Sequence, residues 1–187
     1  MRSIRYFGNG TLKMVEAPEP EIKRADEVKI RVAYCGVCGS DLHFKRAELD
    51  FLFEGDEGTP IGHEATGVIT ELGPAATCKG LKVGDRVVYY YNEHCGNCYY
   101  CRNGQEQFCS NMTGTSAAMS DYIVVREQSV HKLEDTCSLE RGALIEPISV
   151  CLHGIDLLLW MMGGRAVEVC GMLANRFHPE IEAEDLG

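Results

Sequence analysis

Apolar and polar residues alternate in short stretches over the first two thirds of the chain. The clearest alternation runs from residue 28 to residue 34, where Val28, Ile30, Val32 and Tyr34 share one side of the pattern. A period of two is typical of a β-strand with one buried face. Similar stretches predict strands at Ser3–Phe7, Thr11–Val15, Ala65–Leu72, Arg86–Tyr91, Tyr122–Arg126 and Val130–Leu133. Short strands separated by turn signals, such as residues 8–10 (GNG), favour a barrel or a sandwich.

Two helices are expected after the strand-rich part. Ser138–Ala143 has a helix-start pattern, and Ile148–Leu159 is predicted as a second helix that begins just after Pro147. Residues 155–162 form a dense apolar run. Exposed apolar patches usually mark an interface or an aggregation site, so we expect self-association, as a homo-oligomer or as less ordered clusters. No apolar stretch reaches the ~18 residues that a membrane helix needs, and no membrane partner is expected.

Composition narrows the class of protein. The chain has 187 residues, of which 45% are hydrophobic and 25% charged, as in ordinary globular proteins. Its net charge of −10 argues against nucleic acid and anionic membranes as partners. The sequence contains 10 cysteines and shows no export signal at residues 1–4. Cysteine-rich chains of this kind are typical of metal binding in a reducing compartment, and we expect a cytoplasmic protein.

Cys95, Cys98, Cys101 and Cys109 are separated by gaps of two, two and seven residues. A short loop with this spacing can direct four sulfurs at one ion, and four thiolates typically form a closed, structural zinc site. An iron–sulfur cluster is disfavoured, because its bacterial motif has three residues before the last cysteine and a proline after it. A disulfide pair is disfavoured by the missing export signal. The spacing therefore predicts a zinc lobe, which does not by itself identify the activity.

Cys38, His63 and Glu64 form a second candidate ligand set. Residues 38–43 (CGSDLH) follow the predicted strand 28–34, and residues 62–64 (GHE) lead into the next one. Cys, His and Glu can bind zinc and leave the fourth position open for water or substrate. By spacing alone two alternatives remain. Cys35 and Cys38 match a redox CxxC pair, and His63 matches a buried core histidine.

Together these motifs resemble the zinc-dependent medium-chain dehydrogenase/reductase (alcohol dehydrogenase) family, most closely its polyol, butanediol and threonine dehydrogenase branch. The similarity covers residue 1 to about residue 158. It rests on residues 35–41 (CGVCGSD), 62–64 (GHE), 83–87 (VGDRV), the four-cysteine segment and residues 143–147 (ALIEP). The resemblance implies a mainly β fold with flanking helices, namely a GroES-like β-barrel catalytic domain that carries the four-cysteine zinc lobe.

The resemblance also implies roles for single residues. Cys38, His63 and Glu64 would hold a catalytic zinc, and Glu146 would be the carboxylate beside it. Ser40 and His43 would lie on the path that carries the alcohol proton to solvent, and Asp41 would orient a metal ligand. Zinc would polarise the hydroxyl of an alcohol or polyol while NAD(P) accepts the hydride. Ser40 has a less favoured alternative as a turn-capping hydroxyl, whereas Glu146, without the family comparison, is equally interpretable as a helix-start carboxylate.

The sequence departs from the family pattern after residue 158. No GxGxxG fingerprint of a nucleotide-binding domain is present, and only 29 residues follow Leu158. We expect a catalytic domain at 1–158, with its zinc lobe at 93–111. Residues 159–187 would be a truncated, partly disordered remnant, in which residues 163–171 resemble one late strand of that domain.

Two functions of different class follow from this organisation. The first is a zinc-dependent oxidoreductase that oxidises a secondary alcohol (a polyol, a 2,3-diol or a threonine-like substrate) with NAD(P), in a truncated form impaired in turnover. The second is a non-catalytic, zinc-stabilised GroES-like binding module. Binding of NAD(H) is the simplest observation that separates the two.

Overall fold

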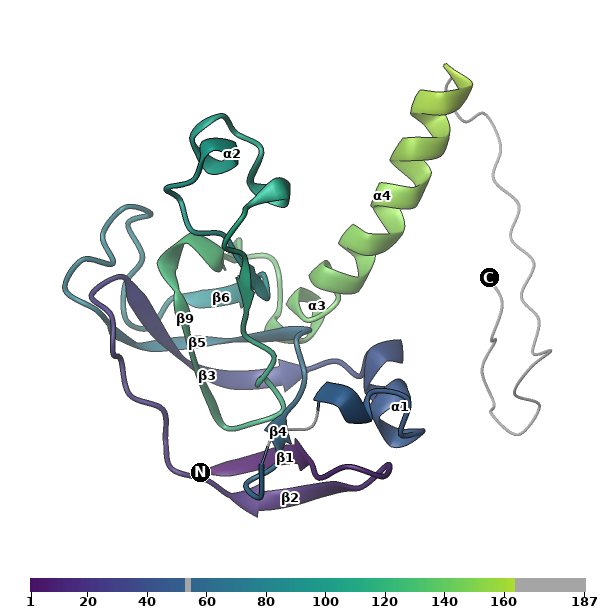
Figure 1. Cartoon of the computed structure of the whole chain (residues 1–187). Helices are drawn as coiled ribbons and strands as arrows, with labels where there is room; N and C mark the ends of the chain where they lie inside the picture. Colours follow the sequence, from purple (N-terminus) through teal and green to yellow (C-terminus); the bar gives the residue numbers. More distant parts are fainter. Residues whose placement is uncertain (53–54, 164–187) are drawn as a thin grey trace. The chain divides into compact units, whose positions relative to one another are not determined.

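A computed structural model of the chain describes residues 1–52 and 55–163 (Figure 1). The chain divides into two compact units, Met1–Ser149 and Val150–Gly187. The described strands are β1 (Arg2–Tyr6), β2 (Leu12–Glu16), β3 (Glu27–Cys35), β4 (Thr59–Pro60), β5 (Ala65–Leu72), β6 (Arg86–Tyr89), β7 (Asn92–Glu93), β8 (Thr113–Gly114), β9 (Tyr122–Arg126) and β10 (Val130–Lys132). The described α-helices are α1 (Gly39–Lys45), α2 (Tyr99–Arg102), α3 (Leu139–Gly142) and α4 (Ile145–Met162), with short 3-10 turns at Asp50–Leu52, Glu106–Phe108 and Glu127–Ser129. The prediction of a mainly β chain with flanking helices is confirmed.

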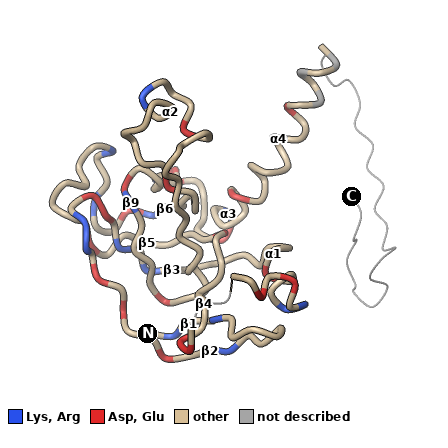
Figure 2. The backbone as a smooth tube through the Cα atoms, viewed as in Figure 1, with Lys and Arg blue, Asp and Glu red and all other residues tan. Residues whose placement is uncertain are grey.

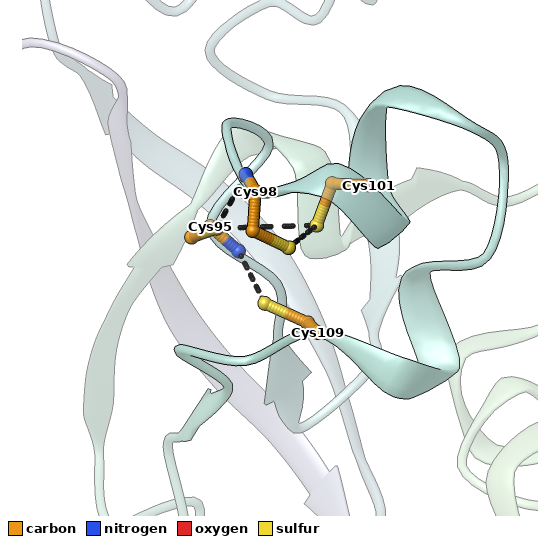
Figure 3. A group of neighbouring side chains, drawn as sticks. All are labelled: Cys95, Cys98, Cys101 and Cys109. Carbon is orange, nitrogen blue, oxygen red and sulfur yellow. Dashed lines mark hydrogen bonds between the residues drawn. The ribbon is translucent and has the colours of Figure 1, made fainter.

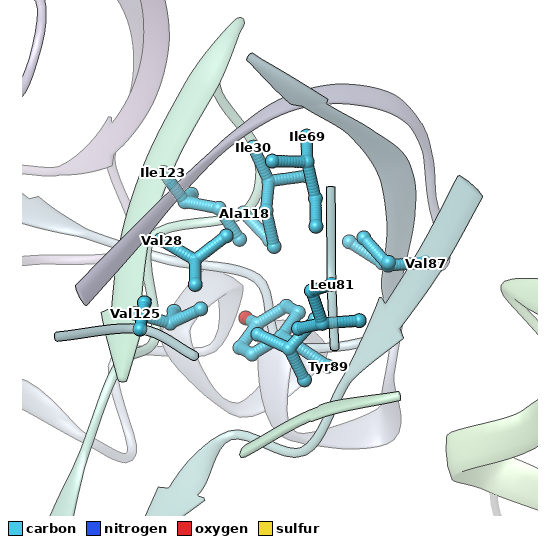
Figure 4. Close-up of a cluster of buried hydrophobic side chains, with 12 residues drawn as sticks. Val28, Ile30, Ile69, Leu81, Val87, Tyr89, Ala118, Ile123 and Val125 are labelled. Atoms are coloured by element: carbon cyan, nitrogen blue, oxygen red, sulfur yellow. The ribbon is translucent and has the colours of Figure 1, made fainter. Parts of the chain in front are cut away.

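The first unit is organised around a five-stranded antiparallel sheet with the order β10-β6-β5-β3-β9. The alternation predicted for β3 buries Val28 and Ile30 almost completely. The pairing of β3 with β5 shifts register twice, and such irregularities bend a sheet and increase its twist. The bent sheet encloses an apolar core, whose members are shown in Figure 4: Val28, Ile30, Ala65, Ile69, Ala76, Leu81, Val87, Tyr89, Ala118, Ile123, Val125 and Val130.

A smaller sheet, β2-β1-β4, carries a second cluster of buried side chains. Its β1–β2 hairpin turns through residues 8–10 (GNG), which all have positive φ, at +78°, +49° and +68°. Glycine and asparagine tolerate this left-handed conformation, and the hairpin predicted from them is confirmed. Tyr6 packs on Phe44 of α1, with the ring centroids 5.0 Å apart, and Ile61 completes the cluster. This contact fixes α1 against the strands.

Two predicted strands have the observed bounds, most other predicted bounds differ by a single residue, and two elements differ by more. β5 and β9 have the predicted bounds, and Ser138 caps α3 by accepting a hydrogen bond from the backbone N–H of Arg141 at 3.2 Å. β6 ends at Tyr89, two residues earlier than predicted. α4 begins at Ile145, before Pro147, so the predicted start at Ile148 was wrong. Proline is tolerated there because the first turn of a helix needs no N–H donor.

α4 is apolar on several sides and carries two acidic residues but no lysine or arginine (Figure 2). Ile155, Leu157 and Met161 in the predicted apolar run are 51%, 54% and 70% exposed. The side chains of Leu158, Trp160 and Met162 lie outside the description, as does the strand expected near residue 166. Among the described helices, none combines the length and hydropathy that a membrane crossing demands. Self-association stays a prediction.

Candidate functional site

The structure brings the three predicted open-site ligands together. The thiol of Cys38, the imidazole of His63 and a carboxylate oxygen of Glu64 all lie within 4.8 Å of one another. Cys38 is the N-cap of α1, just beyond the end of β3, and the other two residues occupy the link from β4 to β5. In a tetrahedral zinc site two such ligands are about 3.4–3.6 Å apart. The three donors therefore lie close enough together to be drawn onto one zinc ion.

Asp41 contacts the backbone of one of these candidate ligands. Its carboxylate accepts a hydrogen bond from the backbone N–H of Cys38 at 2.8 Å, and the residue is only 4% exposed. Burial raises the pKa of the Asp41 carboxyl, although the Cys38 N–H and the nearby His63 both act to lower it. The contact fixes the backbone that carries the Cys38 thiol. It agrees with the orienting role expected for Asp41, which stays a prediction.

Gly36 makes room for the Glu64 carboxylate. A Cβ atom at this position would lie 2.2 Å from the Glu64 carboxylate oxygen Oε2. The Gly36 N–H also donates to the Glu64 carbonyl oxygen at 2.8 Å. A side chain at residue 36 would therefore displace a candidate metal ligand. By contrast, a Cβ at Gly39 would meet nothing within 4 Å.

Glu146 lies in the first turn of α4 and faces the same region. It is 8% exposed, and burial raises its pKa, with His63 lowering it and Glu64 raising it further. These electrostatic interactions place its carboxylate near both candidate ligands. Glu146 also lines a pocket of about 490 Å³ between β6, β10 and the start of α4, whose walls are mainly apolar. Glu146, which the family resemblance assigned to this site, is thus a buried carboxylate that interacts electrostatically with the ligand set, and its role stays a prediction.

Ser40 and His43 both lie on α1. Ser40 is half-buried, and the exposed His43 directs Nδ1 at the carboxylate of Glu48. Glu48 was not predicted, because no motif marks it. The proton-transfer roles of Ser40 and His43 stay predictions.

Cys35 and Tyr91 lie near the ligand set but are not members of it. Burial raises the pKa of the Cys35 thiol to about 12, and both Cys35 and Cys38 are free thiols. The structure therefore contains no disulfide between Cys35 and Cys38, the bond that the redox alternative would form. The ring of Tyr91 lies 5.1 Å, centroid to centroid, from the imidazole of His63. This aromatic contact was not predicted, because Tyr91 looked like the end of a strand.

The four cysteines of the lobe converge as predicted (Figure 3). All four sulfurs lie within 4.8 Å of one another, with Cys98 to Cys101 at 3.5 Å and Cys95 to Cys101 at 4.0 Å. A tetrahedral zinc with bonds of about 2.3 Å would set its sulfurs about 3.8 Å apart. Backbone N–H groups of Asn97 and Cys98 point at the Cys95 sulfur and lower its pKa to about 6. The donor set therefore fits a zinc ion, and all four cysteines are free thiols.

Comparison with known proteins agrees with this architecture. The alcohol dehydrogenase GroES-like domain family matches residues 24–135. The chain is 36% identical over 147 residues to the "Probable D-xylulose reductase A" of Arthroderma otae, covering 76% of this chain and 41% of that protein. It is 37% identical over 137 residues to the D-arabitol-phosphate dehydrogenase of Enterococcus avium, covering 70% and 37%. Galactitol-1-phosphate dehydrogenase from Escherichia coli has a similar structure, with a TM-score of 0.72, 31% identity, and coverage of 84% and 45%.

The chain therefore belongs to the alcohol dehydrogenase family with a GroES-like domain, and the resemblance predicted from its motifs is confirmed. The predicted GroES-like fold with a four-cysteine lobe is confirmed as well. The chain spans less than half the length of these relatives.

Proposed function

We propose that this chain forms the metal-binding half of a zinc-dependent dehydrogenase that oxidises a secondary alcohol of the polyol class with NAD(P). The convergence of Cys38, His63 and Glu64 within 4.8 Å, in a GroES-like domain, carries the proposal. A thiolate, an imidazole and a carboxylate are ligands that zinc accepts, and three protein ligands leave a fourth position for substrate.

The surrounding residues have separate tasks in this proposal. Bound zinc would supply Lewis acidity toward the substrate hydroxyl. Asp41 holds the Cys38 backbone, while Gly36 leaves the space that the Glu64 carboxylate occupies. Glu146 supplies a buried carboxylate that can accept a hydrogen bond from a group at the fourth position. The Ser40 hydroxyl would take the substrate proton and His43, at the exposed side of α1, would release it to solvent.

The substrate class is proposed from the relatives. Their names specify xylulose, arabitol phosphate and galactitol phosphate, which are sugars or sugar alcohols with secondary carbinol or ketone groups. A nicotinamide cofactor is the hydride acceptor that such a reaction requires. Hydride transfer also needs the nicotinamide at about 3–3.5 Å from the carbinol carbon. The impaired turnover expected for this chain stays a prediction.

The proposal is tested with the purified 187-residue polypeptide loaded with zinc. Zinc content is measured first, followed by NADH and NADPH formation with sorbitol, xylitol, 2,3-butanediol and threonine. Cys38→Ser removes a proposed ligand, and Cys78→Ser is the matched control, because Cys78 is an exposed free thiol away from both ligand sets. Loss of one zinc ion in Cys38→Ser alone supports the open site. Equal zinc content in both variants contradicts it.

The alternative function, a zinc-stabilised binding module without turnover, makes a different prediction in the same samples. It expects full zinc content with no calorimetric signal on titration with NAD or NADP. Turnover that disappears in Cys38→Ser would exclude this alternative.

A further inference from the structure

The four-cysteine lobe meets the barrel at the peptide group between His94 and Cys95. The carbonyl oxygen of His94 accepts a hydrogen bond from Nη1 of Arg126 at 2.9 Å and another from the side-chain amide of Gln128. The N–H of Cys95, which belongs to the same peptide group, donates to the sulfur of Cys109 at 3.2 Å. One planar amide therefore contacts an arginine of the barrel on one side and a candidate metal ligand on the other.

The guanidinium of Arg126 is itself held in place. Its Nε and Nη2 both contact the Oδ2 atom of Asp26 at 2.8 Å, and its side chain is 18% exposed. The backbone N–H of Arg126 donates to the carboxylate of Glu93 at 3.1 Å, and Glu93 is 8% exposed. The Thr115 hydroxyl also donates to Glu93 at 3.3 Å. Arg126 is thus tied to both residues that precede Cys95.

This arrangement can act on the metal site through the amide. A hydrogen bond to a carbonyl oxygen polarises the amide and makes its N–H a stronger donor, and a low local dielectric enlarges the effect. A stronger N–H donor stabilises the negative charge of a thiolate that accepts from it. The Arg126 side chain is mostly buried, and its cation lies on the carbonyl side of the amide. The Cys109 sulfur lies on the N–H side and accepts the hydrogen bond that this polarisation strengthens.

We propose that Arg126 is a positioning residue for the metal of the four-cysteine lobe, acting through the His94–Cys95 peptide on Cys109. The inference rests on the proposed zinc in this lobe. Asp26 has the supporting task of orienting the guanidinium, and Gln128 supplies the second donor to the same carbonyl. Residues that support metal ligands in this way typically change metal affinity by about 10–100-fold when substituted.

Arg24 provides a matched control within the same ion-pair group. Its Nε donates to Oδ1 of Asp26 at 3.1 Å, so it shares the carboxylate with Arg126. Its side chain is 59% exposed and pairs with Asp26, while its backbone N–H donates to the carboxylate of Glu27. Arg24→Gln removes the same charge at a similar place and leaves the His94 carbonyl untouched. A role of Asp26 in ordinary stability alone predicts similar effects of Arg24→Gln and Arg126→Gln.

The experiment uses the full chain loaded with cobalt(II), because cobalt held by four thiolates has a sulfur-to-metal absorption several times more intense than the single Cys38 thiolate of the open site can give. Release of this metal to a chelator is timed for wild type, Arg24→Gln, Arg126→Gln, Arg126→Lys and Gln128→Ala. We expect release about 10-fold faster in Arg126→Gln, a smaller acceleration in Gln128→Ala, and a rate within about twofold of wild type in Arg24→Gln. Arg126→Lys should release the metal at a rate between those of wild type and Arg126→Gln. Lysine keeps the positive charge but cannot contact Asp26 and the His94 carbonyl with separate N–H groups of one planar guanidinium.

Urea unfolding of the same samples separates metal positioning from general destabilisation. Wild-type release rates in a folded Arg126→Gln would overturn the proposal. If Arg126→Gln does not fold, Gln128→Ala decides, and an unchanged rate there overturns it equally. A wild-type chain that lacks the four-thiolate absorption would instead contradict the proposed zinc in the lobe.

Discussion

The two candidate metal sites of this chain are built in opposite ways. The four cysteines of the lobe all lie between residues 95 and 109, in a loop whose short helices bury none of their own side chains. The open set collects residues 38, 63 and 64 from two connections of the barrel, supported by the buried Asp41 and Glu146. We therefore expect the lobe to need an ion in order to fold, whereas the barrel should hold the open-site ligands in place before any ion binds.

The largest difference between the sites should appear when a lobe ligand is removed. We expect Cys98→Ser to lose the lobe zinc and to unfold residues 95–109, because the short helices of this loop bury none of their own side chains and metal binding would be its main source of order. Zinc analysis should show one ion fewer, and limited proteolysis should cut rapidly inside the lobe. Cys78→Ser, an exposed thiol outside both sets, is the control. If the lobe of Cys98→Ser resists proteolysis as well as wild type does, the lobe does not depend on its ion and the proposed difference between the two sites is wrong.

Removing a ligand of the open site should have the opposite consequence. In His63→Ala we expect one zinc ion fewer but an intact lobe and a barrel with an unchanged circular dichroism spectrum. The barrel core is formed by other residues, so its stability does not depend on this ion. His131→Ala, which changes an exposed histidine, serves as the control. Zinc content equal to wild type in His63→Ala would show that the open set does not bind zinc.

A third substitution tests whether the barrel positions the open-site ligands in advance. Gly36→Ala places a Cβ where the Glu64 carboxylate now lies, 2.2 Å from its oxygen. We expect a loss of roughly 1–3 kcal/mol in the free energy of unfolding, as in other overpacked sites, and weaker zinc binding at the open set only. Gly39→Ala is the matched control, because nothing lies within 4 Å of its added Cβ. Similar urea midpoints for the two variants would contradict the steric argument.

The smallest expected effect concerns the aromatic contact on His63. Tyr91→Leu removes a ring that lies 5.1 Å from the imidazole. Such contacts contribute about 0.5–1.5 kcal/mol, so cobalt titration should show a several-fold weaker open site. Tyr99→Leu, an exposed tyrosine of the lobe, should leave that affinity unchanged. An equal effect of both substitutions would mean that the ring does not orient the ligand.

The fold could be predicted from sequence wherever a strand has one buried face. β5 and β9 have the predicted bounds, and the alternation at residues 28–34 correctly placed Val28 and Ile30 in the core. Tyr34, predicted on the same face, is 48% exposed, and the pairing with β5 shifts register just before it. β4, β7 and β8 have two residues each, too few for any pattern. α1 was missed for a related reason. It has seven residues, and its start is signalled by Cys38 and Asp41, which do not have the usual appearance of a capping pair.

The sites were predictable to different extents for the same physical reason. The lobe could be predicted by spacing, because its ligands are neighbours in the sequence. The open set joins residues 38, 63 and 64, and Glu146 lies near them. No periodicity relates these distant positions, so residue types and spacing offered the open set only beside its alternatives, and the family resemblance was needed to favour it. Contacts that depend on the folded barrel, such as Arg126 with His94 and Tyr91 with His63, left no signal in the sequence.

The neck of the lobe has a consequence for how this protein can vary. The chain leaves the barrel through β7 and returns through β8, and the two strands pair as Asn92 with Gly114 and Glu93 with Thr113. Paired residues of antiparallel strands lie only about 4.5–5.5 Å apart. Lengthening or replacing everything between them costs little loop-closure entropy and leaves the register of the five-stranded sheet unchanged. We therefore expect the segment between residues 93 and 113 to tolerate insertions, with these two residues as its points of attachment to the barrel.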